Sequence, residues 1–347
     1  MGDQMALSKI KTVPESPAGN ASNPYGVEID DIRAHLFEWQ SSGLPCALLT
    51  LVNYEGSSPR PVGSQLVVNA RGERAGLISG GCIEAALIEE ALASLDQTAP
   101  RLVRYGKDSD FMDIRLPCGS GIDVFIHPNP SKTVVECLYQ AYRNRQPITL
   151  CIDIKSVLSN EVSKPSSASA DQWLCTSKEK KLQTNQQLGR QEASKITVFP
   201  RHYHPRTRIV VIGEGAIFGA FRAMAALFDL ELLAYTHAEI SQAGFGFPVL
   251  DAWTAVVTLS HDHDKEEALL VQALNSEAFH IAALGSRATQ AARLARLRQL
   301  GCSDSELARI KGPAGLDLGG QTPAEIALSI MAEIVGMKNS KLTVQKC

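Results

Sequence analysis

The stretch from residue 208 to residue 219 reads RIVVIGEGAIFG, and it decides the fold of the second half of the chain. Arg208 to Ile212 form a strand pattern that runs directly into a glycine turn and then into a helical pattern through Phe228. Strand, glycine turn and helix in this order open a Rossmann-like fold, in which helix N–H groups face a pyrophosphate. Gly213 and Gly215 are therefore candidate cofactor-binding residues.

Two features of this opening disfavour NAD(P) binding. The third glycine, Gly219, falls one residue late and gives GxGxxxG. The strand expected at Glu231 to Tyr235 ends in Tyr235-Thr236 rather than in an acid that would hold a ribose hydroxyl. An NAD(P)-dependent oxidoreductase stays as the alternative function, because the first two glycines are intact, although no Tyr-x-x-x-Lys or comparable catalytic pair is present.

Strand and helix patterns alternate as far as residue 300. We expect strands at Ala255–Leu259 and Phe279–Leu284, and helices at Asp264–Leu274 and about Ala288–Leu300. This order predicts a parallel, doubly wound sheet, which binds ligands at the carboxyl ends of its strands. Polar residues that follow these strands are candidate cofactor-binding residues: His261, His263, Gly285, Ser286 and Arg287.

Each of these clusters also has a plainer interpretation. The i, i+2 spacing of His261 and His263 allows a metal site, but solvated loop residues are the commoner outcome. Gly285-Ser286-Arg287 is either a phosphate seat or a simple turn with a surface arginine. In the loop that follows, a capping box accounts for Thr322 and Glu325 but leaves Asp317, between glycines, as a further candidate cofactor-binding residue.

In the N-terminal half, two cysteines lie in glycine-rich turns. Cys82 stands in SGGCIE at 79–84 and Cys118 in PCGSG at 117–121. Glycines leave a thiol open to a large ligand, and Cys82 precedes a helical run that favours the thiolate at its N-terminus. The alternative is that both are small buried hydrophobic residues. Both are candidate catalytic thiols, with these candidate cofactor-binding neighbours: Gly80, Gly81, Glu84 and Gly119.

The remaining N-terminal patterns predict a small α+β domain. A helical stripe begins at Ile32, a buried strand runs from Cys46 to Val52, and a hairpin joins Gln65–Val68 to Ala75–Ile78. A helix from Ile83 to Leu95, a strand at Gly121–His127, a helix near Val134–Arg145 and a strand at Ile148–Ile154 complete it. Between the first strand and the hairpin, EGSSPR at 55–60 has the donors of an anion pocket, so candidate cofactor-binding residues there are Ser57, Ser58 and Arg60.

Composition narrows the class of protein. The chain has 347 residues with a net charge of −3, so it lacks the basic footprint of a nucleic-acid or membrane-surface protein. We see no membrane-spanning run and no secretory signal, which makes the cytoplasm the default location. Eight scattered cysteines without a CxxC pair argue against a disulfide framework and a structural zinc site.

The expected organisation is two α/β domains joined by a polar segment. Residues 1–25 are expected to be a disordered leader, 26–154 the α+β domain, 155–205 a polar linker or excursion, 206–338 the Rossmann-like domain and 339–347 a tail.

Six motifs in one order resemble the XdhC/CoxI family, the accessory factors that mature xanthine dehydrogenase and related molybdenum hydroxylases. They are EGSSPR at 55–60, SGGCIE at 79–84, CG at 118–119, SHDH at 260–263, LGSR at 284–287, and GLD at 315–317 with TPAEIA at 322–327. The resemblance covers about residues 30–150 and 206–337. It departs from the family pattern at Ala216, where a histidine is common, and at Tyr235-Thr236, where an acid is common.

The resemblance implies a cytosolic factor that binds molybdenum cofactor (molybdopterin), supports its sulfuration with a cysteine desulfurase and delivers it to a xanthine dehydrogenase-type apo-enzyme. Such a factor is a binding and insertion chaperone rather than an enzyme with turnover. Cys82 and Cys118 become the candidate sulfur-handling thiols, either of which would supply a molybdenum contact, with no other metal site expected. We also expect a homo-oligomer.

Overall fold

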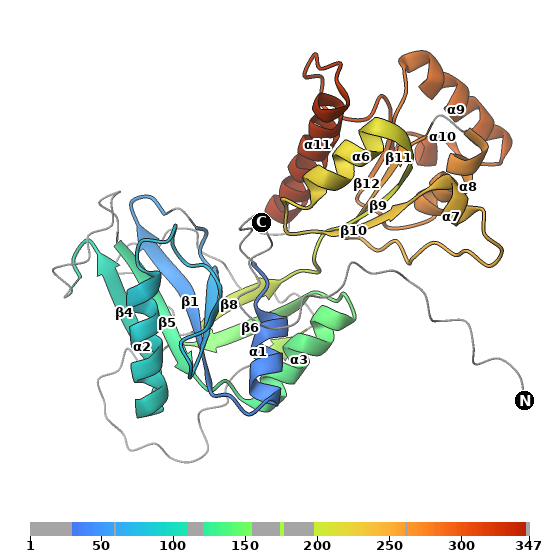
Figure 1. The fold of residues 1–347 in the computed structure, drawn as a ribbon. Helices are drawn as coiled ribbons and strands as arrows, with labels where there is room; N and C mark the ends of the chain where they lie inside the picture. The colour runs from blue at the N-terminus through green and yellow to red at the C-terminus, as the bar shows by residue number, and fades with distance from the viewer. Residues whose placement is uncertain are drawn as a thin grey trace, which may run out of the picture. The chain divides into compact units, whose positions relative to one another are not determined.

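The structure is a computed structural model that describes residues 30–58, 60–109, 121–154, 174–176, 198–260 and 263–344. The described residues up to Pro205 form one compact unit, and those from Arg206 onward form a second (Figure 1). The leader expected at 1–25 and most of the segment 155–197 lie outside the described residues. Each unit has its own main sheet and its own core.

The N-terminal unit is an α+β fold built on an antiparallel sheet. Its five strands lie in the order β3-β2-β1-β5-β4, and a smaller sheet has the order β7-β6-β8. The elements are α1 (Arg33–Ser41), β1 (Cys46–Glu55), β2 (Gln65–Asn69), β3 (Arg74–Gly76), α2 (Glu84–Gln97), β4 (Arg101–Gly106), β5 (Gly121–Pro128), α3 (Lys132–Arg143), β6 (Ile148–Asp153), β7 (Leu174–Thr176) and β8 (Val198–Tyr203).

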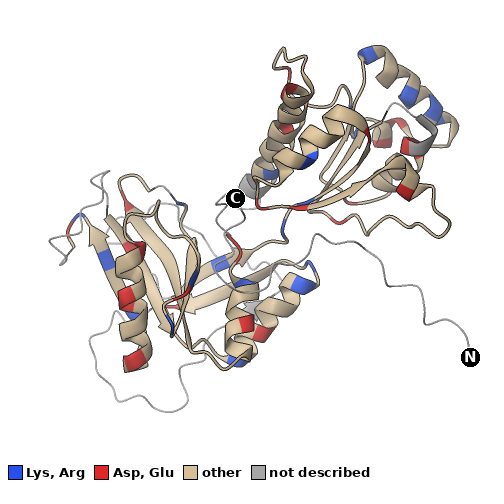
Figure 2. Cartoon of the chain, viewed as in Figure 1, with Lys and Arg blue, Asp and Glu red and all other residues tan. Residues whose placement is uncertain are grey.

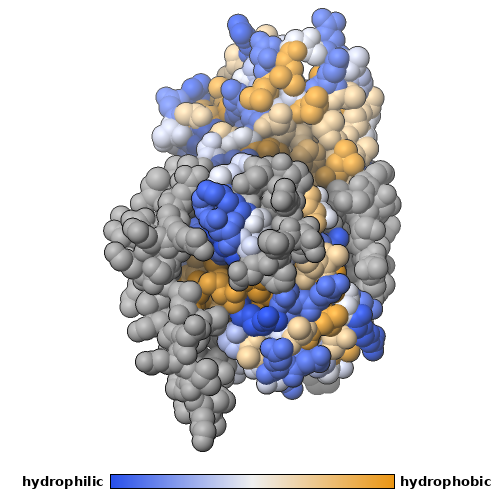
Figure 3. Space-filling model, turned by 90° about the vertical axis from the view of Figure 1, so that its left-hand side faces the viewer, coloured by the Kyte–Doolittle hydropathy of each residue, from blue (hydrophilic) through white to orange (hydrophobic). Residues whose placement is uncertain are grey.

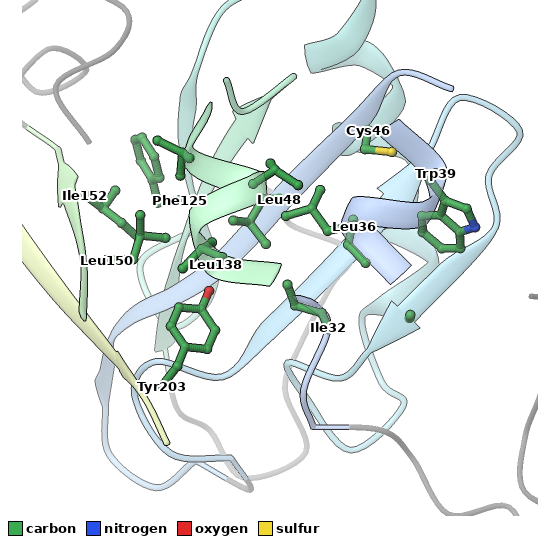
Figure 4. Close-up of a cluster of buried hydrophobic side chains, with 14 of the residues drawn as sticks. Ile32, Leu36, Trp39, Cys46, Leu48, Phe125, Leu138, Leu150, Ile152 and Tyr203 are labelled. Atoms are coloured by element: carbon green, nitrogen blue, oxygen red, sulfur yellow. The ribbon is translucent and has the colours of Figure 1, made fainter. Parts of the chain in front are cut away.

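Side-chain alternation along β1 divides the core of this unit into two layers. Leu48 packs with α1, α3 and the smaller sheet, in the cluster drawn in Figure 4. Leu49, its neighbour, points to the opposite face and packs with Leu87 of α2. Period-2 alternation in a strand places successive side chains on opposite faces, so the largely apolar run of β1 indicates a central strand that is covered on both sides.

The C-terminal unit is a Rossmann-like fold with a fully parallel sheet, as expected. The strand order is β10-β9-β11-β12-β13. The elements are β9 (Arg208–Gly213), α6 (Gly215–Ala225), β10 (Glu231–Tyr235), α7 (His237–Ile240), β11 (Thr254–Leu259), α8 (His263–Leu274), β12 (His280–Ala283), α9 (Arg287–Gln299), α10 (Asp304–Leu307), β13 (Ile310–Lys311) and α11 (Pro323–Val344).

Helices cover both faces of this sheet, which is the doubly wound arrangement. Val211 of β9 packs with α6 and α11, whereas its neighbour Val210 packs with α8 and α9. The capping box expected at the start of α11 is present: Thr322 N–H donates to Glu325 at 2.9 Å, and Glu325 N–H donates to the Thr322 hydroxyl at 3.3 Å. The fold class predicted from the sequence is confirmed.

Some elements differ from the sequence-based expectation. β4, α7, α10 and β13 were not expected. β8 lies inside the segment that we expected to be a polar linker, and it pairs antiparallel with β6 along its whole length. The buried hydroxyl of Tyr203 in β8 donates to Gln65 at 2.6 Å, so the end of this segment belongs to the N-terminal core.

The surface carries no extended apolar area in the view of Figure 3, where hydrophilic residues are interspersed with hydrophobic ones among the described residues of each unit. Within the described ranges, no helix combines the length and the apolar character that crossing a bilayer requires.

Candidate functional site

The Cys82 turn presents its thiol to solvent. Cys82 is exposed and is not disulfide-bonded, and it lies two residues before the first residue of α2. Gly81 adopts φ +100°, a conformation that side chains disfavour, and a Cβ built there would meet no atom within 4 Å. The backbone therefore requires glycine while the space around it stays open, so a bulky ligand can approach the sulfur.

A buried carboxylate organises this turn from below. Glu84 is only 5% exposed and accepts hydrogen bonds from Ser79 N–H at 2.8 Å, the Ser79 hydroxyl at 2.6 Å and Ile83 N–H at 3.2 Å. The Ser79 oxygen in turn accepts from the N–H groups of Gly81 and Cys82, each at 3.2 Å. The structure thus places Glu84, expected as a cofactor contact, underneath the turn as its positioning residue.

The other thiols of the described residues are unlike Cys82. Burial raises the pKa of Cys46 to about 12, and it also raises the pKa of Cys151. The pKa of Cys302 is raised by burial and then by the nearby Glu306 carboxylate. Cys137 of α3 is exposed but stands on a helix face without a glycine turn. Cys118 and Gly119 lie outside the described residues.

The EGSSPR loop belongs to the same unit, and its arginine already has a partner. Arg60 makes an ion pair with Asp30, and the Ser58 hydroxyl donates to the Arg60 carbonyl at 2.8 Å. Ser57 is exposed at the end of β1. These contacts shape the loop, and they leave Arg60 less available to an anion than an unpaired arginine would be.

In the C-terminal unit, the glycine turn after β9 holds an unexpected polar relay. The Ser260 hydroxyl at the end of β11 lies 2.6 Å from His237 Nε2. His237 follows β10, and its Nδ1 lies 3.4 Å from Glu214 Oε1, which also accepts from His237 N–H at 3.1 Å. The relay joins three neighbouring strand ends at the point where a dinucleotide would bind.

The two glycines of that turn are therefore not spare backbone around an open groove. A Cβ on Gly213 would approach Leu259 Cβ to 2.8 Å, so the close contact of β9 with β11 explains this glycine without a ligand. Sequence reasoning missed His237, whose signal was its position directly after the strand ending in Tyr235-Thr236. His261 lies outside the described residues, and His263 is the first residue of α8.

A pocket of about 580 Å³ opens at the carboxyl ends of β12 and β13. It brings together Arg287 and Asp317, two candidate residues that are thirty positions apart in the sequence, and adds Lys311, which sequence reasoning missed. Gly285 and Ser286 stand beside the pocket, where the Ser286 hydroxyl caps α9 by accepting from Thr289 N–H at 3.1 Å. Proteins use pockets of this size for small molecules and cofactors.

No cluster of three or more metal-ligating side chains occurs among the residues that the structure describes. The candidate residues thus fall into a thiol turn with the EGSSPR loop in the N-terminal unit, and a strand-end relay and pocket in the C-terminal unit.

Comparisons with known proteins agree with this architecture and define the class of protein. Residues 39–106 match the family model described as "XdhC and CoxI family", and residues 209–334 match the "XdhC Rossmann domain". The chain belongs to the XdhC/CoxI family.

Individual relatives are similar over most of the chain. The molybdenum cofactor insertion chaperone PaoD of Escherichia coli is 30% identical over 86% of this chain and 85% of its own length. A protein of Bacillus subtilis described as a probable xanthine dehydrogenase component is 24% identical over 83% of this chain and 92% of its own. A crystal structure titled as a xanthine dehydrogenase from Bacillus halodurans has the same fold, with TM-score 0.60 and 20% identity over 89% of this chain and 96% of that one.

Proposed function

We propose that this chain binds molybdenum cofactor, supports its sulfuration and delivers it to a molybdenum hydroxylase of the xanthine dehydrogenase type. The similarity to a molybdenum cofactor insertion chaperone supports the role of a maturation factor. The observation that carries the proposal to a site is the exposed thiol of Cys82 on a rigid turn. In this role the cofactor is cargo that the protein receives and releases.

The chemistry of the turn suits sulfur handling. A thiolate attacks the outer sulfur of a persulfide on a cysteine desulfurase, a new S–S bond forms on Cys82, and the desulfurase cysteine leaves as a thiolate. Soft sulfur is also a suitable ligand for a transition metal. The Glu84 contacts fix the backbone of the turn, so a sulfur on Cys82 is presented at one place rather than on a flexible loop.

The EGSSPR loop and Cys118 belong to the same proposal. Ser57 and Ser58 offer hydroxyl donors near the end of β1, and Cys118, one of the two expected thiols, would share the sulfur-handling role. The desulfurase, the client enzyme, a homo-oligomer and a cytoplasmic location stay predictions that follow from the family resemblance.

The test is anaerobic retention of molybdenum cofactor after desalting, scored by bound molybdenum and pterin. We expect near-stoichiometric retention by the wild type and a loss of most of it in Cys82→Ser. Cys137→Ser is the matched control, because Cys137 is an exposed cysteine of the same unit outside any glycine turn. Cys118→Ser, tested in parallel, should behave like Cys82→Ser if the two thiols act together.

Two results would contradict the proposal. A wild type that retains neither molybdenum nor pterin does not carry the cofactor. Equal retention by Cys82→Ser and Cys137→Ser would remove the thiol from the site, and a large loss of stability in Cys82→Ser with normal retention would make Cys82 a structural residue.

A further inference from the structure

One arginine of α9 differs from the others on its helix. α9 carries four arginines and no acidic residue, and Figure 2 shows them as a run of blue. Arg293 pairs with Glu266 at 2.8 Å, Arg296 with Glu267 at 2.6 Å and Arg298 with Asp304 at 2.6 Å. Arg287 makes no ion pair or hydrogen bond with any described residue, and it lines the pocket at the ends of β12 and β13.

A second cation of the pocket is held only loosely. Lys311 Nζ lies 3.7 Å from Glu333 Oε1, near the limit of an ion pair, and its side chain is 57% exposed. The other oxygen of Glu333 is engaged by His280 Nε2 at 3.2 Å and by Gly315 N–H at 3.0 Å. Lys311 is therefore free to turn toward an anion in the pocket at small cost, because an exposed pair of this kind contributes about 1 kcal/mol or less.

The loop from 312 to 320 supplies an apolar wall and open backbone donors. Leu316 and Leu318 line the pocket yet are 48% and 53% exposed, which is unusual for leucine unless a ligand covers it. Among the described residues, the N–H groups of Leu318 and Gly320 have no hydrogen-bond acceptor. The pocket thus offers surface for a flat ring and donors for an anion.

Asp317 provides the remaining specificity. One oxygen of its carboxylate accepts from Gly319 N–H at 3.3 Å, and the residue lines the pocket. A carboxylate accepts two parallel hydrogen bonds from adjacent N–H groups on a planar ligand. The 2-amino-4-oxopyrimidine edge of a pterin, and the same edge of guanine, carries such a pair of N–H groups.

We propose that this pocket binds a phosphate ester carried on a flat 2-amino-4-oxo heterocycle, with Arg287 and Lys311 at the phosphate and Asp317 at the ring edge. The choice of the pterin of molybdenum cofactor as that heterocycle rests on the proposed function, because the pterin carries a phosphate. Guanosine monophosphate has the same chemistry. The paired Arg60 of the EGSSPR loop is a poorer phosphate ligand than the unpaired Arg287.

The test is isothermal titration calorimetry on the full chain with three probes: the oxidised, metal-free pterin of the cofactor, the same pterin after removal of its phosphate, and guanosine monophosphate. We expect the phosphorylated pterin to bind, and removal of its phosphate to raise Kd about tenfold or more. Arg287→Ala should raise Kd by a similar factor, with Arg287→Lys between it and the wild type. Arg298→Ala, on the same helix but paired with Asp304, is the matched control and should bind normally.

Asp317→Asn tests the ring edge separately. It keeps an oxygen for Gly319 N–H but loses the carboxylate, so binding of the phosphorylated pterin and of guanosine monophosphate should weaken several-fold. Cytidine monophosphate lacks the paired N–H groups and should respond to Arg287→Ala but not to Asp317→Asn.

The outcomes separate this inference from the proposed function. Binding that is equal in Arg287→Ala and Arg298→Ala, or no binding of any probe, overturns the pocket. Binding of guanosine monophosphate through Arg287, with no binding of the pterin, supports the pocket and counts against molybdenum cofactor as cargo. Binding of the phosphorylated pterin through Arg287, with no thiol-dependent retention of molybdenum, supports the pocket and overturns only the thiol site.

Discussion

Ser79 and Glu84 form a closed pair of hydrogen bonds beneath the Cys82 turn. The backbone N–H and the hydroxyl of Ser79 donate to the two oxygens of the Glu84 carboxylate, at 2.8 and 2.6 Å, and both residues are buried. The acid is the first residue of α2, where the helix dipole favours a negative charge. The conformation of the turn is thus set by the helix that follows it, and the thiol inherits that rigidity.

We expect Glu84→Gln to destabilise the protein by about 1–3 kcal/mol, because one buried donor of Ser79 loses its charged acceptor. Chemical denaturation measures this change. The matched control is Glu89→Gln, which changes an exposed acid on the same helix and should cost less than about 0.5 kcal/mol. The rate of Cys82 alkylation should also change in Glu84→Gln alone, and equal stability of the two variants would contradict the positioning role.

The described cysteines should react with a thiol reagent in a fixed order. At pH 7.5 we expect Cys82 and Cys137, both exposed, to be alkylated within minutes, as read by peptide mass spectrometry. Cys46 and Cys151 should stay unmodified in the folded protein, because burial raises the pKa of each and excludes the reagent. Labelling of Cys46 at the rate of Cys82 would show that the β1 core opens readily.

His127 should make the protein less stable in mild acid. Burial lowers its pKa from 6.5 to about 4. Below pH 6.5 the unfolded chain takes up a proton that the folded chain does not, so stability falls as the pH decreases from 6.5 to 4, by up to about 3 kcal/mol for this residue. Urea denaturation across that range should show a shallower decline in His127→Gln; an unchanged slope would exclude this histidine as the cause.

NAD(H) and NADP(H) should not stabilise the protein. The Glu214 carboxylate and the His237 ring occupy the glycine turn where a pyrophosphate would bind, and the carboxylate repels it. At millimolar dinucleotide we expect the melting temperature to change by less than about 1 °C. A rise of several degrees would instead support the oxidoreductase alternative.

The sequence predicted the parts of the fold whose side-chain periodicity is strong. β9 and α6 were predicted because an apolar strand, a glycine turn and an apolar helix follow one another without interruption. β4 was missed because its alternation places arginines at 101 and 104 beside buried residues. β8 was missed because Pro200 and charged neighbours obscure a strand that is defined by its pairing with β6.

The candidate site was predicted unevenly for a similar reason. Glycines around Cys82 reveal an open thiol locally, and the structure shows it exposed. The pairing state of an arginine depends on distant residues, so the sequence did not distinguish Arg60, which has Asp30, from Arg287, which has no acidic partner among the described residues. Lys311 and His237 become candidates only when the strand ends are brought together in space.

The pairing of β6 with β8 also determines how this protein tolerates added sequence. Asp153 and Val198 are opposite one another in the ladder, so both ends of the intervening segment are fixed side by side. For a loop closed in this way, doubling its length costs only about 0.6 kcal/mol. The segment is therefore the place where an affinity tag, a fluorescent domain or a tethered client can be inserted while the thiol turn and the strand-end pocket keep their structure.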